Sequence, residues 1–277
     1  MTTPYSTPRA DQATPAIARV YDYVLGGGHN FAADREVAEH LLAVVPAYRD
    51  FALENRAFLR RSALHMLDAG IDQFLDLGSG LLSVGPAHEI VHAVNPAGRV
   101  VYVDNDPIVT ANVELSIGGD PRIGVIQADA CDVRSVLGPR ASRVLDLKRP
   151  VGVLAVAVLH CICDADDPRR ALSEYHDRLA GGSMLAASHG SGDGLSPELI
   201  TAGKKILADA GITFVDRTRA EFAALLGPWQ PTPEGVVRLN RWRPEGTGVA
   251  QDDDVLGYAV VATSTGPPVR TPAAATR

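Results

Sequence analysis

Cysteine is scarce in this sequence, which has only Cys131, Cys161 and Cys163 among its 277 residues. Three thiols are too few for the disulfide framework of a small secreted protein, and the Cys-x-Cys spacing of the last two matches no zinc-binding motif. Unpaired cysteines are usually buried like other small apolar residues. We therefore interpret Cys161 and Cys163 as neighbouring positions on one face of a strand, and we expect a reducing compartment.

Basic residues are fewer than acidic ones: the sequence has 26 lysines and arginines and 33 aspartates and glutamates, which gives a net charge of −7. Proteins that bind nucleic acids without sequence preference depend on basic side chains that neutralise phosphates. The charge balance therefore argues against nucleic acid as a partner.

Long apolar runs are missing as well. The longest, residues 151–163, falls short of the ~20 residues that a membrane-spanning helix needs, and it suits a buried strand better. Residues 1–15 lack the apolar segment of a signal peptide. We expect a cytoplasmic protein with no membrane partner.

The remaining composition is that of a folded domain, with 46% apolar and 21% charged residues. Between Tyr48 and Leu67, apolar side chains recur every three or four positions, as they do along a helix. Gly70 follows as a residue that tolerates the left-handed backbone beyond a helix end. These features predict a helical N-terminal cap over residues 16–70.

From residue 71 onward, strand-like and helix-like segments alternate. The expected strands are Gln73–Leu77, Arg99–Val103, Ile123–Gln127, Val151–Leu159, Ser183–Ser188, Ile212–Val215 and Gly257–Thr263. Prolines suited to the first turn of a helix stand between them, namely Pro86, Pro107, Pro168 and Pro197. A capping box is expected at Thr218 and Glu221.

Apolar strands that alternate with helices predict a parallel sheet covered on both faces. We therefore predict a Rossmann-like α/β fold with a seven-stranded, mostly parallel sheet, an antiparallel last strand and a helical N-terminal extension. The α/β domain would extend over residues 71–265. The Pro-rich ends, residues 1–15 and 266–277, are predicted to be disordered.

A glycine turn follows a carboxylate at the end of the first expected strand, in Asp76-Leu77-Gly78-Ser79-Gly80. Ligands of open α/β sheets bind at the carboxyl ends of the strands, and glycine lets the backbone approach a ligand closely. A dinucleotide-binding turn would have a third glycine where this chain has Ser83. Asp76 would repel a pyrophosphate and attract a cationic ligand, so an NAD-dependent oxidoreductase is the less favoured hypothesis.

Two more acidic residues follow the next two strands. Asp104 could accept hydrogen bonds from both hydroxyls of a ribose. Asp129 could accept one from an adenine amine, while the Ala130 N–H serves a ring nitrogen. Each Asp alone is most simply a turn residue, but three acids at the ends of three consecutive strands indicate a nucleoside site.

These motifs resemble those of class I S-adenosylmethionine-dependent methyltransferases. The closer resemblance is to a family of S-adenosyl methyltransferases formerly catalogued as a domain of unknown function. Its hallmarks are matched by residues 21–35 (YDYVLGGGHNFAADR), 54–59 (ENRAFL), 102–107 (YVDNDP) and 158–160 (VLH). The resemblance covers roughly residues 15–265 and departs from the general class at Leu82, where a third glycine is common.

The resemblance implies a cofactor site at the carboxyl edge of the sheet. Asp76 and the glycine turn would hold the methionyl end of S-adenosylmethionine, Asp104 would bind the ribose, and Asn105 would pack beside the adenine. The cofactor-binding residues so implied are Tyr21, Asp76, Gly78, Ser79, Gly80, Asp104, Asn105, Asp129, Ala130 and Leu159.

The resemblance also places residues near the methyl acceptor. His160 is a candidate general base because the fourth strand would deliver it there; the alternative is a histidine that hydrogen-bonds a loop carbonyl. Residues 21–35 set aromatic side chains beside three glycines, which is typical of a mobile cap, and Tyr21 could cover the adenosine or the sulfonium. Asp167 is most simply a helix cap, and no metal site is expected.

We therefore predict an S-adenosylmethionine-dependent methyltransferase that acts on a small molecule. Two alternatives are an NAD-dependent oxidoreductase and a non-catalytic module that binds S-adenosylmethionine. No motif specifies the acceptor, the methylated atom or the oligomeric state.

Overall fold

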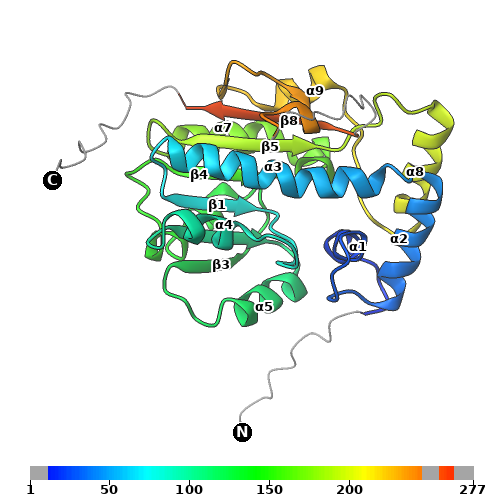
Figure 1. The fold of residues 1–277 in the computed structure, drawn as a ribbon, viewed down its shortest axis with the longest axis horizontal. Helices are drawn as coiled ribbons and strands as arrows, with labels where there is room; N and C mark the ends of the chain where they lie inside the picture. Colours follow the sequence, from blue (N-terminus) through cyan, green and yellow to red (C-terminus); the bar gives the residue numbers. More distant parts are fainter. Residues whose placement is uncertain (1–11, 245–255, 265–277) are drawn as a thin grey trace, which may run out of the picture.

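The strands assemble into one twisted sheet with helices packed on both of its faces (Figure 1). The computed structural model describes residues 12–244 and 256–264. Apart from residues 12–15, the ends predicted to be disordered lie outside the described residues.

Three helices precede the first strand: α1 (Ile17–Val24), α2 (Ala32–Val44) and α3 (Tyr48–Asp68). The later helices are α4 (Ala87–Val94), α5 (Pro107–Ser116), α6 (Val133–Val136), α7 (Pro168–Arg178), α8 (Pro197–Asp209) and α9 (Arg219–Leu225). Single 3-10 turns lie at Ala141–Arg143, Leu159–Cys161, Asp164–Asp166 and Leu239–Arg241.

Most of the predicted helix starts are confirmed. Pro107, Pro168 and Pro197 occupy the first helical turn, and the side chain before each proline accepts a backbone N–H from that turn. Helix α9 begins with the predicted capping box. Pro86 was expected inside its helix but is the N-cap of α4, because its backbone is extended (ψ 153°).

The strands are β1 (Gln73–Leu77), β2 (Arg99–Asp104), β3 (Ile123–Gln127), β4 (Gly152–Ala155), β5 (Met184–His189), β6 (Gln230–Pro231), β7 (Val237–Arg238) and β8 (Tyr258–Thr263). Their order is β3-β2-β1-β4-β5-β8-β6, and β7 also pairs with β8. Strands β1–β5 are parallel, whereas β8 runs antiparallel to β5. The predicted fold class is therefore confirmed.

Two strand predictions are wrong in detail. Residues Ile212–Val215 form no strand, because β8 already pairs with the edge of β5 that they would need. Two-residue strands β6 and β7 pair with β8 instead, so the described residues contain eight strands rather than seven. The fourth strand ends at Ala155 rather than Leu159, because the positive φ of Ala157 (59°) turns the chain away.

Each face of the sheet packs against its own apolar core. Phe74 contributes to the core beneath α3, α4 and α5, and its neighbour Leu75 to the core beneath α6, α7 and α9. The parallel strands end at one edge, and α1 lies beyond that edge with α2 and α8 further out (Figure 1). Among the described residues, no helix combines the length and the apolar character needed to cross a bilayer.

Candidate functional site

A cavity of about 380 Å³ lies at the carboxyl edge of the parallel strands. Its walls come from the segments that follow β1, β2, β3 and β4, and from α1. The predicted site residues that line it are Tyr21, Gly78, Ser79, Gly80, Asp104, Asn105, Asp129, Ala130 and His160. Asp76 and Leu159 are buried and are not among its lining residues.

The glycine turn folds against the end of β2. The N–H groups of Gly78 and Ser79 donate to the carbonyl of Val103 at 2.8 and 3.0 Å. Gly78 has φ +65°, and a Cβ there would collide with Val158. Glycine is therefore required at this position by both the backbone conformation and the lack of space.

Asp104 is oriented by two backbone donors. Its Oδ2 accepts the Gly80 N–H at 2.9 Å, and its Oδ1 accepts the Asp106 N–H at 3.0 Å. Burial raises the pKa of Asp104, although these hydrogen bonds oppose the rise. Because a carboxylate oxygen can accept more than one hydrogen bond, the fixed carboxylate can still accept bonds from a ligand.

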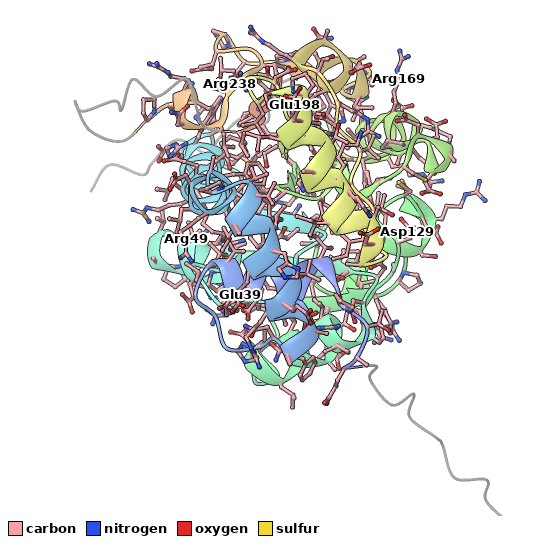
Figure 2. The ribbon with its side chains drawn as sticks, turned by 90° about the vertical axis from the view of Figure 1, so that its right-hand side faces the viewer. Glu39, Arg49, Asp129, Arg169, Glu198 and Arg238 are labelled. Atoms are coloured by element: carbon pink, nitrogen blue, oxygen red, sulfur yellow. The ribbon has the colours of Figure 1, made fainter. Side chains whose placement is uncertain are left out.

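The segment after β3 presents a carboxylate beside a fixed peptide. Asp129 Oδ1 accepts the Cys131 N–H at 2.7 Å, and the Ala130 carbonyl accepts the Tyr175 hydroxyl at 2.8 Å. Figure 2 views the molecule from this edge, with Asp129 labelled. Asp129 and Asn105 are exposed at the rim of the cavity.

Asp76 lies within β1, beside the cavity rather than in its wall. Its side chain is 7% exposed, and within the described residues its carboxylate forms no hydrogen bond. Burial raises the pKa of Asp76 from 3.8 to about 7, the charge of Arg56 lowers it, and the charge of Asp104 raises it further. A buried carboxylate of this kind favours a cation nearby.

Arg56 joins α3 to the loop beyond the glycine turn and also lines the cavity. Its Nε donates to the Val84 carbonyl at 2.9 Å and its Nη2 to the Gly85 carbonyl at 3.0 Å. In the described part of the chain, Nη1 forms no hydrogen bond. The guanidinium can therefore bind a ligand carboxylate.

Asp22 organises the glycine-rich segment of the predicted cap. Its Oδ2 accepts the His29 N–H at 2.9 Å and the Asn30 amide at 2.8 Å, and its Oδ1 accepts the Ser83 hydroxyl. A Cβ on Gly27 would collide with this carboxylate. Gly27 therefore packs against the Asp22 carboxylate, and none of the three glycines lines the cavity, which α1 lines instead.

A buried ion pair fixes α1 against α2. Arg19 Nε lies 2.8 Å from Asp34 Oδ2, and both side chains are almost fully buried. Asp34 also accepts the N–H groups of Ala16 and Phe31, at 2.9 and 2.8 Å. Arg19 Nη1 lies 3.5 Å from Asp106 Oδ2, which links α1 to the start of α5.

A hydrogen-bonded chain supports the turn after β4. Ala157 adopts φ +59°, which L-residues other than Asn, Asp and Gly rarely adopt. Its N–H donates to Ser188 Oγ at 2.9 Å, and the Ser188 hydroxyl donates to Asn55 Oδ1 at 2.5 Å. This turn places His160 in the wall of the cavity.

His160 has a defined tautomer. Its Nδ1 accepts the Gly190 N–H at 3.0 Å, so a neutral His160 has its hydrogen on Nε2. Burial holds the pKa of His160 well below its usual value, and the nearby His189 and Arg217 lower it further. The arrangement makes His160 a hydrogen-bond donor and disfavours the predicted role as general base.

Arg217 holds the segment that contains His160, and no sequence motif singled it out. Its side chain is buried, and its guanidinium donates to the carbonyls of Leu159 and Ile162 at 2.9 Å and to Asp164 Oδ1 at 2.7 Å. It also donates to His189 Nε2 at 3.0 Å, so His189 is neutral with its hydrogen on Nδ1. The Leu159 carbonyl accepts this bond while its side chain packs in the apolar core, so Leu159 supports the wall without lining it.

Comparisons with protein families and with solved structures point to a single protein family. The profile described as S-adenosyl methyltransferase matches residues 4–265. The crystal structure of a DUF574 family protein from Streptomyces avermitilis is 32% identical, with a TM-score of 0.86 over 92% of this chain and 100% of that chain. That of a proposed methyltransferase from Thermobifida fusca is 35% identical, with a TM-score of 0.84 over 95% of this chain and 100% of that chain. No curated protein matches the sequence significantly.

Proposed function

The chain belongs to the S-adenosyl methyltransferase family, which uses S-adenosylmethionine as the methyl donor, and we propose that it methylates a small molecule in the cavity at the carboxyl edge of the sheet. The observation that carries the proposal is that Asp104 and Asp129 line one cavity at the ends of two adjacent strands, with Asp76 buried beside it near the end of the next strand.

The cavity suits this cofactor in size and in charge. Its volume of about 380 Å³ lies within the range of roughly 300–1,000 Å³ that is common for small-molecule sites. The cofactor has a sulfonium and an ammonium; the carboxylate of Asp76 is buried beside the cavity, and the half-buried carboxylate of Asp104 lines it. The raised pKa of Asp76 means that a cation beside it would stabilise its ionised form.

When bound, S-adenosylmethionine supplies a methyl group on a sulfonium. The acceptor atom would form its new bond to carbon with its own lone pair, and the electron pair of the broken S–C bond would stay on sulfur. Any proton on the acceptor would be released to solvent as the methylated product leaves. Asp104 would accept the ribose hydroxyls. Asp129 and the Ala130 N–H would contact the adenine edge, with Asn105 beside the ring. Arg56 would bind the methionyl carboxylate through Nη1.

The glycine turn and α1 would enclose the bound cofactor. Gly78, Ser79 and Gly80 line the cavity with backbone that can approach a ligand closely. Tyr21 also lines the cavity, and its hydroxyl donates to the Ala52 carbonyl at 3.0 Å, which fixes its ring. This enclosure would exclude water from the reacting atoms.

His160 would act by positioning the acceptor. With Nδ1 occupied by the Gly190 N–H, the available group is the Nε2 hydrogen. A donor beside the acceptor can orient a nucleophilic lone pair toward the methyl group, and correct orientation alone contributes a large rate factor.

A small acceptor is favoured by the walls of the cavity. The carboxylates of Asp106, Asp129 and Asp166 line it together with α1. A nucleic acid would bring phosphates to these carboxylates, which repel negative charge. An uncharged or cationic small molecule meets no such repulsion.

Two measurements test the proposed function. Calorimetric titration is expected to show binding of S-adenosylmethionine and no binding of NAD. Release of S-adenosylhomocysteine is then measured with a panel of small alcohols, phenols and amines, and with oligonucleotides and a protein extract as controls. Turnover with nucleic acid or protein alone would contradict a small-molecule acceptor, and NAD binding alone would favour an oxidoreductase. Tight cofactor binding without turnover on any acceptor would favour a non-catalytic module.

A further inference from the structure

A second, smaller cavity lies between α2, α3 and α8. Its volume is about 70 Å³, and its exposed surface is almost entirely apolar. Figures 1 and 2 both show α2 and α8 side by side at this edge of the molecule. The side chains that shape it include Leu41, Val45, Phe51, Leu207 and Phe214. We call this cavity the apolar slot.

Tyr48 lines both the apolar slot and the cofactor cavity. Its ring stacks on Phe51 with 5.8 Å between centroids, which fixes the side chain. Within the described residues, its hydroxyl forms no hydrogen bond. Burial raises the pKa of Tyr48, so the phenol stays protonated and can donate. A half-buried donor that has no hydrogen-bond partner in the described part of the chain therefore lines both cavities.

His160 lies next to two of the side chains that line the slot. It lines the cofactor cavity, and its ring centroid lies 5.9 Å from that of Phe51 and 5.4 Å from that of Phe214. Both aromatic rings line the apolar slot. A molecule in the slot could place a polar end beside Tyr48, the residue that lines both cavities.

We propose that the apolar slot holds a compact branched alkyl group of the methyl acceptor, and that Tyr48 donates a hydrogen bond that positions the acceptor's polar end toward the cofactor cavity. This inference rests on the proposed function and specifies its substrate class. A cavity that accommodates benzene measures ~150 Å³, about twice the volume of the slot. By the same proportion, the slot holds an alkyl group of about three carbons, such as an isopropyl group, rather than an aromatic ring.

Gly203 provides a way to fill the slot without touching the cofactor cavity. It lies in α8 and lines the slot, and a Cβ added there would meet Val45 Cγ2 at 3.4 Å. In Gly203→Leu, the added side chain would occupy the slot. Ala208→Leu is a matched control, because Ala208 is exposed on the same helix and is not a slot residue.

The test uses 3-methyl-1-butanol as the probe and glycerol as the polar control, with the full-length protein and S-adenosylhomocysteine present. Saturation-transfer NMR is expected to show contact with the methyl groups of the probe in wild type and in Ala208→Leu, and no signal from glycerol. Gly203→Leu should lower the probe signal at least fivefold. Tyr48→Phe should weaken probe binding about fivefold while contact with its methyl groups persists.

Equal probe signals in wild type and Gly203→Leu, or no signal in wild type, would overturn this inference. The affinity of each variant for S-adenosylmethionine, measured by calorimetry, reports on the proposed function separately. A protein that binds the cofactor normally but not the probe overturns the substrate class alone. Absence of cofactor binding in wild type would overturn the proposed function as well.

Discussion

The carboxylate of Asp104 accepts a hydrogen bond from the backbone N–H of Gly80 at 2.9 Å, so the end of β2 holds the glycine turn that follows β1. The two motifs are separated in sequence and act as one unit in space. A ligand that binds Asp104 therefore meets a turn whose backbone is already in position, which lowers the cost of ordering on binding.

Replacing Asp104 by alanine is expected to weaken the binding of S-adenosylmethionine roughly tenfold to a hundredfold. Hydrogen bonds to a charged group contribute ~1.5–3 kcal/mol each, and the substitution also removes the acceptor for the Gly80 N–H. Calorimetric titration measures the change. Asp104→Asn, which keeps one carbonyl oxygen, should lose less affinity, and an unchanged dissociation constant in Asp104→Ala would rule out the ribose role.

The affinity for S-adenosylmethionine is expected to rise with pH through about 7. In the free protein the pKa of Asp76 is raised to about 7, so the carboxyl is protonated and neutral below that pH. A cationic ligand favours the ionised form, so binding below pH 7 must release this proton and weakens by up to about tenfold per pH unit. Above pH 7 the contribution of Asp76 to the profile should level off, because the carboxyl is then ionised.

Titrations between pH 5.5 and 8.5 measure this profile, with Asp76→Asn as the control. The variant has no proton to release at this position, so its affinity should be lower and should not vary across the same window. A flat profile in wild type would show that Asp76 does not interact with the bound cation.

The His160 imidazole is expected to remain neutral from pH 6 to pH 8, with its hydrogen on Nε2. Burial and two neighbouring groups hold its pKa well below the usual value, and Nδ1 accepts the Gly190 N–H. Nitrogen chemical shifts of ¹⁵N-labelled histidine distinguish the tautomers. His160→Ala identifies the signal, and titration near pH 6.5 would restore the hypothesis of a general base.

Replacing Asp22 by alanine should loosen the glycine-rich segment. The substitution removes the acceptor for the His29 N–H, the Asn30 amide and the Ser83 hydroxyl together. Hydrogen exchange at the His29 amide should accelerate at least tenfold, because its protection depends on that acceptor.

Glu39→Ala is the matched control for Asp22→Ala. Glu39 accepts an exposed hydrogen bond from the Tyr23 hydroxyl at 2.9 Å and lies on α2 (Figure 2). Its loss should leave the exchange of the His29 amide unchanged. Equal exchange in wild type and Asp22→Ala would mean that the glycines hold the segment without the carboxylate.

Replacing Ser188 by alanine should lower the free energy of unfolding by ~1–3 kcal/mol, the cost of leaving buried polar groups without partners. The hydroxyl serves both the Ala157 N–H and Asn55 Oδ1. Urea denaturation measures the change. Ser116→Ala, which removes an exposed hydroxyl bonded to the Asn112 carbonyl, should alter stability by less than about 0.5 kcal/mol. A similar effect of both substitutions would contradict the role of Ser188.

The sequence predicted the fold class because its signals are local. Apolar periodicity, prolines at helix starts and the capping box at Thr218 each act within one turn or one strand. A local pattern does not show whether a sheet has a free edge for one more strand. Residues 212–215 have the composition of a strand, but β8 already occupies the edge of β5 with which they would pair.

By itself, the sequence determined which residues follow the parallel strands, and the parallel arrangement then brings Asp104, Asp129 and the glycine turn around one cavity. Only the tertiary structure decided the state of the groups in its wall. Asn55 and Ser188 are 133 positions apart, yet their hydrogen bond supports the turn after β4. The burial of Asp76, the tautomer of His160 and the apolar slot likewise depend on packing between distant segments. The spacing of residues along the chain does not predict such contacts, because they form only when the helices pack against the sheet.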